Sequence, residues 1–439
     1  MATIKLETYG PGAYGSTSSS LFQAKLLNAV NTAPAGTVID CTSYTGAQTL
    51  TSTVSIKKPL TLLFGKVTIT FATGAGKHMF CVLSSNVQII GTSRSTATAS
   101  NDAGTVFKMP VSGSGYHVYA ANTSTTGTVS PSGLVLENID FEGLKSTYTS
   151  VSNVATYTYL GAGGIVVAEG NPGQSGSNVS NILLRNIHVN SARHHGIMIY
   201  GAITSKLEKC RVRNTGGHGY YITGSSTSVH LDTCYALSTD LSGFCLHGTS
   251  YCALTACAAD NCSLGYWLRS AKATSMNGCG AEASVIKSGT LPYNLGITLW
   301  SSGGTVTISD IGSDNIGFFK GTSYLITGGE GNTLTSCYSK DPGNRATEDT
   351  YGHAKTSHFT IAGPARTNKI SAPVVTGDSP LKYLFRVEDI GDDYPTFNFI
   401  EYLMYYVETS NPEPADDPAM TSVGDLFNKG NTYLITFID

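Results

Sequence analysis

Aromatic, histidine and arginine side chains recur at related positions between residues 193 and 300. Flat rings beside polar groups suit sugar rings, whose C–H faces stack on aromatic side chains. Both tryptophans of the chain, Trp267 and Trp300, belong to this set. We therefore predict a carbohydrate site here, with binding residues Arg193, His195, Tyr200, Tyr221, His247, Trp267 and Trp300.

Four glycines set the phase of the strands that carry these residues. Gly196, Gly219, Gly243 and Gly265 recur at spacings of 23, 24 and 22 residues. In the strand after each glycine the first and third residues are apolar or aromatic, so they should point inward, and the second and fourth outward. A slip of one residue would bury Arg269 and His247 at large cost. A ligand or, alternatively, a loop or neighbouring subunit should cover the outward rings.

Two aspartates in the same segment favour one possible chemistry. Asp240 and Asp260 lie on successive repeats, and adjacent coils of a stacked sheet are about 4.8 Å apart. A carboxylate pair at such a range can hydrolyse a glycosidic bond. The sequence therefore predicts Asp240 and Asp260 as candidate catalytic residues of a glycoside hydrolase.

β-Elimination of a uronic-acid polymer is the rival chemistry. It needs a cation to neutralise the substrate carboxylate and a base to remove the C5 proton. Arg269 or Arg193 can be the cation, and His195, His218 or Tyr221 the base. The residue types leave both reactions open. No C-x-x-C pair occurs, so neither a zinc site nor a cofactor is predicted.

A repeat organises the chain around these residues. A second register mark, formed by Ile187, Cys210, Cys234, Cys257 and Cys279, recurs at spacings of 23, 24, 23 and 22 residues. A period in the low twenties with short β runs predicts a parallel β-helix. The cysteines at this mark should be reduced and buried, each stacking on its copy in the next coil.

Composition and the chain ends complete the expectations. Only 13% of the 439 residues are charged and the net charge is −3, so a nucleic-acid partner is not predicted. No apolar run is long enough to span a membrane, and the N-terminus has no apolar core of a signal peptide. We expect a cap with a helix over 18–30 in residues 1–36, a β-helix over 37–365 and a C-terminal element, a cap or a trimerisation piece, over 366–439.

A family resemblance adds to this reading. The features of the chain follow one another in a definite order. They are a Gly-rich start with Tyr14-Gly15, one helix, Ala35–Ile39, Thr49–Ile56, Ser85–Gly91 and then the glycine-anchored coils. The chain resembles the pectate-lyase-like superfamily of right-handed parallel β-helices, in the branch of bacteriophage tailspikes and capsule depolymerases. Gly217-His218-Gly219 also matches the Gly-His-Gly motif of polygalacturonases locally, but their accompanying aspartate motifs are missing upstream.

The resemblance implies a function. It implies a homotrimeric virion protein of the phage tail that acts outside the cell, binds and depolymerises a bacterial surface polysaccharide, and attaches through its N-terminus to a tail adaptor. Two alternatives remain: a receptor-binding spike that grips the glycan without cutting it, and a free bacterial polysaccharide lyase or hydrolase.

Overall fold

The computed structural model describes residues 2–15, 20–72, 78–93, 104–109, 115–120, 131–143, 163–168, 179–282, 295–300, 307–309, 312–314, 322–327, 330–340, 357–362, 366–372, 374–377, 383–388, 399–407 and 432–435. It contains two compact units, residues 1–230 and 231–439, called here the N-terminal and C-terminal units. Each unit is built from short parallel strands of successive coils, so the prediction of a parallel β-helix is confirmed. None of the described helices is long and apolar enough to cross a membrane.

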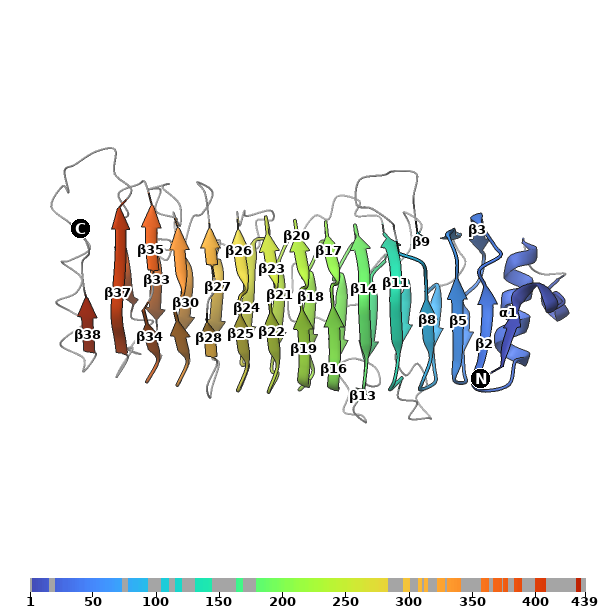
Figure 1. The fold of residues 1–439 in the computed structure, drawn as a ribbon, viewed down its shortest axis with the longest axis horizontal. Coiled ribbons are helices and arrows are strands. Elements are labelled where there is room, and N and C mark those ends of the chain that lie inside the picture. The colour runs from blue at the N-terminus through green and yellow to red at the C-terminus, as the bar shows by residue number, and fades with distance from the viewer. Residues whose placement is uncertain are drawn as a thin grey trace. The chain divides into compact units, whose positions relative to one another are not determined.

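The N-terminal unit contributes strands to two sheets, sheet A and sheet B (Figure 1). In sheet A they are β1 (Thr3–Lys5), β2 (Thr37–Cys41), β3 (Gly46–Leu50), β5 (Leu60–Phe64), β6 (Val67–Phe71), β8 (Gln88–Ile90), β9 (Thr105–Lys108), β11 (Val135–Glu142), β13 (Val179–Ser180), β14 (Leu183–Asn190), β16 (Ala202–Glu208) and β17 (Arg211–Arg213); β19 (Thr227–Asp232) crosses the unit boundary. In sheet B they are β4 (Val54–Ile56), β7 (Phe80–Val82), β10 (Val118–Ala120), β12 (Ile165–Ala168), β15 (Ile197–Tyr200) and β18 (Tyr220–Thr223). Alternation of side chains explains the strands, as in β6, where Val67, Ile69 and Phe71 are buried and the threonines between them are not.

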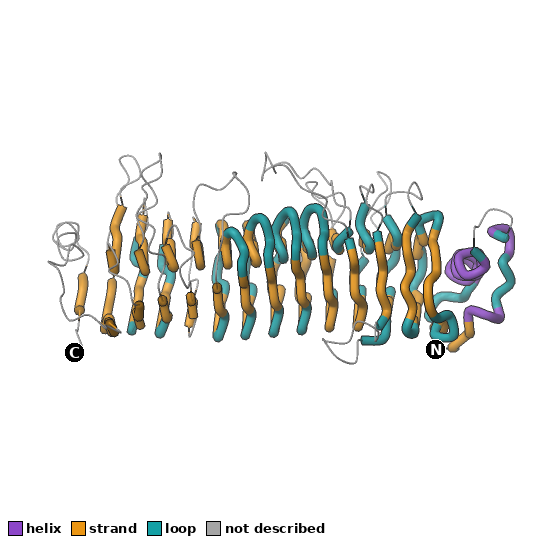
Figure 2. Tube along the Cα trace, turned by 90° about the horizontal axis from the view of Figure 1, so that it is seen from above, coloured by secondary structure: helices purple, strands orange, loops and turns teal. Residues whose placement is uncertain are grey.

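A single helix of more than one turn, α1 (Leu21–Thr32), lies at the start of the N-terminal unit in the described chain (Figure 2). Its N-cap is Ser20, whose hydroxyl accepts a hydrogen bond from the Gln23 N–H at 3.2 Å. Phe22, Leu26 and Val30 form its buried face, and the helix contacts β3 and β4. Two 3₁₀ turns, Leu6–Thr8 and Gly12–Tyr14, precede it. The predicted cap helix is confirmed, beginning three residues later than expected because Ser20 is the residue that caps it.

The C-terminal unit also consists of short parallel strands that belong to sheets A and B. Its sheet A strands are β20 (Tyr235–Leu237), β22 (Ala253–Thr255), β23 (Ala258–Asp260), β25 (Ser275–Asn277), β26 (Gly280–Glu282), β28 (Thr307–Ser309), β29 (Gly312–Asp314), β31 (Thr333–Thr335), β32 (Tyr338–Lys340), β34 (Lys369–Ser371), β35 (Val374–Gly377), β37 (Phe399–Val407) and β38 (Thr432–Ile435). Its sheet B strands are β21 (Ser242–His247), β24 (Leu264–Arg269), β27 (Leu295–Trp300), β30 (Thr322–Thr327), β33 (Ser357–Ala362) and β36 (Tyr383–Glu388). The segment 366–439, expected as a separate element, supplies β34–β38, which pair in parallel with the preceding coils. Its role as a cap or trimerisation piece stays a prediction.

The second register mark lies in the core. Cys210, Cys234, Cys257 and Cys279 are free thiols and at most 2% exposed, as predicted. The residue before each cysteine has a left-handed backbone conformation: Lys209 (φ 53°), Thr233 (φ 53°), Ala256 (φ 49°) and Gly278 (φ 57°). Each coil therefore turns one residue before its cysteine. Aromatic rings add a second internal stack, as between Phe244 and Tyr266, whose centroids are 4.9 Å apart.

Candidate functional site

Three predicted side chains come together on the outer surface of sheet B in the C-terminal unit. In β24, Tyr266 and Leu268 are fully buried while Trp267 and Arg269 are partly exposed, so the predicted phase is correct. His247 of β21 lies in register with Arg269. The Arg269 guanidinium carbon lies 5.8 Å from the centroid of the Trp267 ring, within the range of a cation–π contact. We call His247, Trp267 and Arg269 the outer strip.

The outer strip carries one positive charge at pH 7, that of Arg269, and this charge suits an acidic ligand. Burial, and then the positive charge of Arg269, lowers the pKa of His247 below its usual value. The imidazole is therefore neutral at pH 7 and able to accept a proton. Cys245, in register with Trp267, is 2% exposed, and burial raises the pKa of its thiol. The cysteine is thus an uncharged thiol rather than a nucleophile.

Trp300 is placed next to the outer strip by the pairing of its backbone alone. Its backbone in β27 pairs with Arg269 in the parallel ladder. Its side chain lies outside the described part of the structure, so its predicted contact with a ligand stays a prediction.

The two aspartates occupy different positions of their coils. Asp260 ends β23 and lies opposite Leu237, three residues before Asp240 along the preceding coil. The Asp260 carboxylate accepts a hydrogen bond from the Tyr235 hydroxyl at 2.9 Å, and the Ser263 hydroxyl donates to the backbone carbonyl of Asp240 at 2.8 Å. Both aspartates are partly exposed. They therefore lie on neighbouring coils but not in one column, and their joint catalytic role stays a prediction.

In the N-terminal unit, His195, His218 and Tyr221 gather into one buried cluster. The rings of His195 and His218 stack with centroids 5.1 Å apart, and Tyr221 lies 4.8 Å from His195 and 5.0 Å from His218. The Nδ1 atom of His195 accepts the backbone N–H of His218 at 3.0 Å. All three side chains are buried, with exposed fractions of 8%, 1% and 5%, so the loop residues His195 and His218 cover the outward ring of Tyr221 and leave it no open face for a ligand.

The local reason for this burial is close packing of the loops before the anchor glycines. A Cβ atom on Gly217 would lie 2.6 Å from Nδ1 of His195, so only glycine lets the imidazole approach. His194 packs against His195 with ring centroids 3.8 Å apart. Burial lowers the pKa of His194 to about 4, and burial together with the two neighbouring imidazoles lowers that of His195 well below its usual value.

Two further predicted residues lie near this cluster in sequence. Tyr200 is partly exposed at the end of β15, in register with Thr223, and its ring packs closely over Gly224. Arg193 is partly exposed, and its buried Nε atom has no hydrogen-bond partner among the described residues. Within the described ranges, no three His, Cys, Asp or Glu side chains converge as ligands of a metal ion would.

One ordered dyad in the N-terminal unit was not among the predicted site residues. Nδ1 of His188 in β14 lies 3.0 Å from the Asp140 carboxylate in β11, and the two residues are in register. The signal was present, because 134–141 (LVLENIDF) and 182–189 (ILLRNIHV) share one pattern that aligns these positions. The dyad lies on sheet A, whereas the predicted aromatic and basic residues were assigned to the strands of sheet B.

Comparison with known families identifies the class of fold. Residues 63–309 and 174–347 match the family described as "Right handed beta helix region". The matched residues are more than half of the chain, so the chain belongs to this family, and the predicted superfamily and handedness are confirmed. No curated protein matches the sequence.

Solved structures with similar folds include enzymes and phage proteins. A DFA-IIIase from Arthrobacter chlorophenolicus A6, without its lid and in complex with GF2, has a TM-score of 0.55 at 12% identity over 86% of this chain and 89% of its own. The pre-mature gene product 12 of bacteriophage phi29 has a TM-score of 0.53 at 11% identity, covering 93% of this chain and 53% of its own. The catalytic domain of a GH87 α-1,3-glucanase, in complex with tetrasaccharides, has a TM-score of 0.50 at 10% identity over 94% of this chain and 66% of its own. At these identities the likeness shows the fold alone.

Proposed function

We propose that this chain is a tailspike-like protein that binds an acidic bacterial surface polysaccharide along the outer strip and cleaves it by β-elimination. The observation that carries the proposal is the pairing of Trp267 with Arg269 on the outside of sheet B. A partly exposed indole beside a guanidinium offers a stacking surface for a sugar ring and a partner for its carboxylate. The phage proteins among the similar folds support a place in the phage tail. The homotrimer and the attachment to an adaptor through the N-terminus rest on the family resemblance.

Elimination needs one base and one cation, and the outer strip holds both. Arg269 would pair with the C6 carboxylate of a uronic-acid residue and stabilise the negative charge that develops on it. The neutral imidazole of His247 would remove the C5 proton. The C4–O bond then breaks, its electron pair leaves with the glycosidic oxygen, which takes a proton from solvent, and a C4–C5 double bond forms. The role of base, predicted for His195, His218 or Tyr221, is therefore assigned to His247, because those three side chains are buried.

Hydrolysis is the second candidate reaction. The partly exposed carboxylates of Asp240 and Asp260 favour it, as does the hydroxyl of Tyr235 that orients Asp260. Hydrolysis yields reducing ends without a double bond. The two reactions therefore differ in their products.

The test measures binding and both products with polyuronates and capsular polysaccharides as substrates. Elimination predicts ultraviolet absorbance from unsaturated uronates together with new reducing ends, whereas reducing ends alone would support hydrolysis. Arg269→Ala and His247→Ala should remove the absorbance signal while the chain stays folded. Binding without either product would leave a non-catalytic receptor and overturn the enzymatic proposal.

Removal of the indole tests the binding surface directly. Trp267→Ala should weaken polysaccharide binding by about 1–3 kcal/mol, the range for burying a large apolar side chain. Tyr251→Ala is the matched control, because Tyr251 is an aromatic residue of the same unit that is 67% exposed and lies outside the strip. Equal affinity of the two variants, measured by calorimetry, would show that the polysaccharide binds elsewhere.

A further inference from the structure

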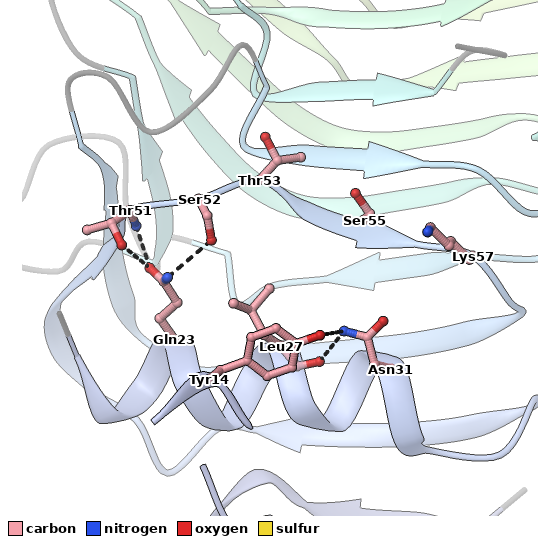
Figure 3. A pocket seen from close by; sticks show the side chains of 9 residues that line it. All are labelled: Tyr14, Gln23, Leu27, Asn31, Thr51, Ser52, Thr53, Ser55 and Lys57. Carbon is pink, nitrogen blue, oxygen red and sulfur yellow. Dashed lines mark hydrogen bonds between the residues drawn. The ribbon is translucent and has the colours of Figure 1, made fainter. Parts of the chain in front are cut away.

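A polar pocket lies in the N-terminal unit between α1 and the segment that leads through β4. Its volume is about 380 Å³, within the roughly 300–1,000 Å³ range of small-molecule sites. Figure 3 shows the helix side chains on one wall and the hydroxyl-bearing segment on the other. The lining residues are Tyr14, Gln23, Leu27, Asn31, Thr51, Ser52, Thr53, Ser55 and Lys57.

Two amide side chains from α1 are held in fixed orientations. Oε1 of Gln23 accepts hydrogen bonds from the N–H and the hydroxyl of Thr51, and its Nε2 donates to the hydroxyl of Ser52 at 3.1 Å (Figure 3). Nδ2 of Asn31 donates to the Leu27 carbonyl at 2.7 Å and to the Tyr14 hydroxyl at 2.8 Å. These bonds preorganise the pocket wall, so a ligand need not order it.

Other polar groups of the pocket are left for a ligand. Among the described residues, Oδ1 of Asn31, the hydroxyl of Ser55 and the ammonium of Lys57 have no hydrogen-bond or ion-pair partner. Thr53 donates its hydroxyl proton to the His78 carbonyl at 2.6 Å, so its oxygen can still accept. The lining contains donors, acceptors and one cation, but no carboxylate.

We propose that this pocket binds a sugar residue that carries a carboxylate, such as one uronic-acid unit of a polysaccharide. Tyr14 and Leu27 supply apolar surface for the C–H face of the ring. The hydroxyls and the Asn31 carbonyl oxygen match the alternating donors and acceptors of a polyol. Lys57, which is exposed at the pocket, pairs with the carboxylate.

The pocket is a second saccharide site and does not depend on the outer strip. Its residues all belong to positions 14–57, whereas the strip spans positions 247–269. Occupation of the pocket would place one sugar unit against the cap helix of the N-terminal unit.

Glucuronate and glucose are the probes for the full-length chain, with binding followed by saturation-transfer NMR. Glucuronate should bind about threefold more tightly than glucose, as expected for one ion pair at a solvent-exposed lysine. Lys57→Ala should remove this preference, and Ser55→Ala should weaken both sugars. Lys66→Ala, which removes an exposed lysine outside the pocket, should change nothing.

A Trp267→Ala background separates this site from the outer strip. The pocket proposal predicts that glucuronate binding persists in Trp267→Ala and disappears when Lys57→Ala and Ser55→Ala are added. If Trp267→Ala alone removes all binding, or if Lys57→Ala retains the full preference for glucuronate, the pocket proposal is wrong, whatever the outcome for the strip. Circular dichroism of each variant checks that the fold is intact.

Discussion

Acidification should destabilise the N-terminal unit because it contains buried neutral imidazoles. Burial lowers the pKa of His117 to about 3 and that of His194 to about 4, both below the ordinary value of 6.5. The folded chain therefore keeps these side chains neutral where the unfolded chain binds protons. Stability from this source is complete above about pH 6.5 and is lost as the pH falls toward the folded pKa values.

The size of the effect follows from the difference in proton binding. At pH 5 an unfolded histidine is almost fully protonated, whereas either buried imidazole is still mostly neutral. One pKa unit corresponds to about 1.4 kcal/mol. Each of the two residues should therefore lower the free energy of unfolding by roughly 2 kcal/mol between pH 7 and pH 5. Urea denaturation at the two pH values measures this loss.

A substitution isolates the contribution of His194. Its Nδ1 atom is buried and has no hydrogen-bond partner among the described residues, so His194→Leu removes no bond at that atom. Between pH 7 and pH 5 the free energy of unfolding of this variant should fall by roughly 2 kcal/mol less than that of the unmodified chain. Val212→Ala, a cavity-forming change at a buried residue of the same unit, should lower stability equally at both pH values. Equal acid losses in His194→Leu and the unmodified chain would refute the reasoning.

The thiols and the oligomeric state provide two further tests. Cys210, Cys234, Cys257 and Cys279 should resist a thiol reagent until urea unfolds the chain, because each is at most 2% exposed; rapid labelling in the folded state would contradict the assigned register. The resemblance to tailspikes predicts a homotrimer, which light scattering at micromolar concentration would detect, and a monomeric mass would exclude it.

The fold could be read from the sequence because its determinants are local. The repeat of the anchor glycines and the cysteines defines the coil length, and alternation within each strand defines which side chains face inward. Tyr220 and Tyr266 illustrate this, since their hydroxyls reach the carbonyls of Cys210 and Cys257, both at 2.7 Å, inside the coils. Ser20 likewise marks the start of α1 through its own hydroxyl.

The sites could be read only in part, because exposure depends on what other coils place over a side chain. Trp267 and Tyr221 occupy equivalent outward positions, yet one is partly exposed and the other is buried under His195 and His218. The polar pocket joins Tyr14, side chains of α1 and the segment 51–57 that runs through β4, which no spacing in the sequence brings together. Sequence period and alternation thus determined the β-helix and the direction of each strand residue. Only the tertiary packing decided which outward residues meet solvent, because loops and neighbouring coils compete with water for the same surface.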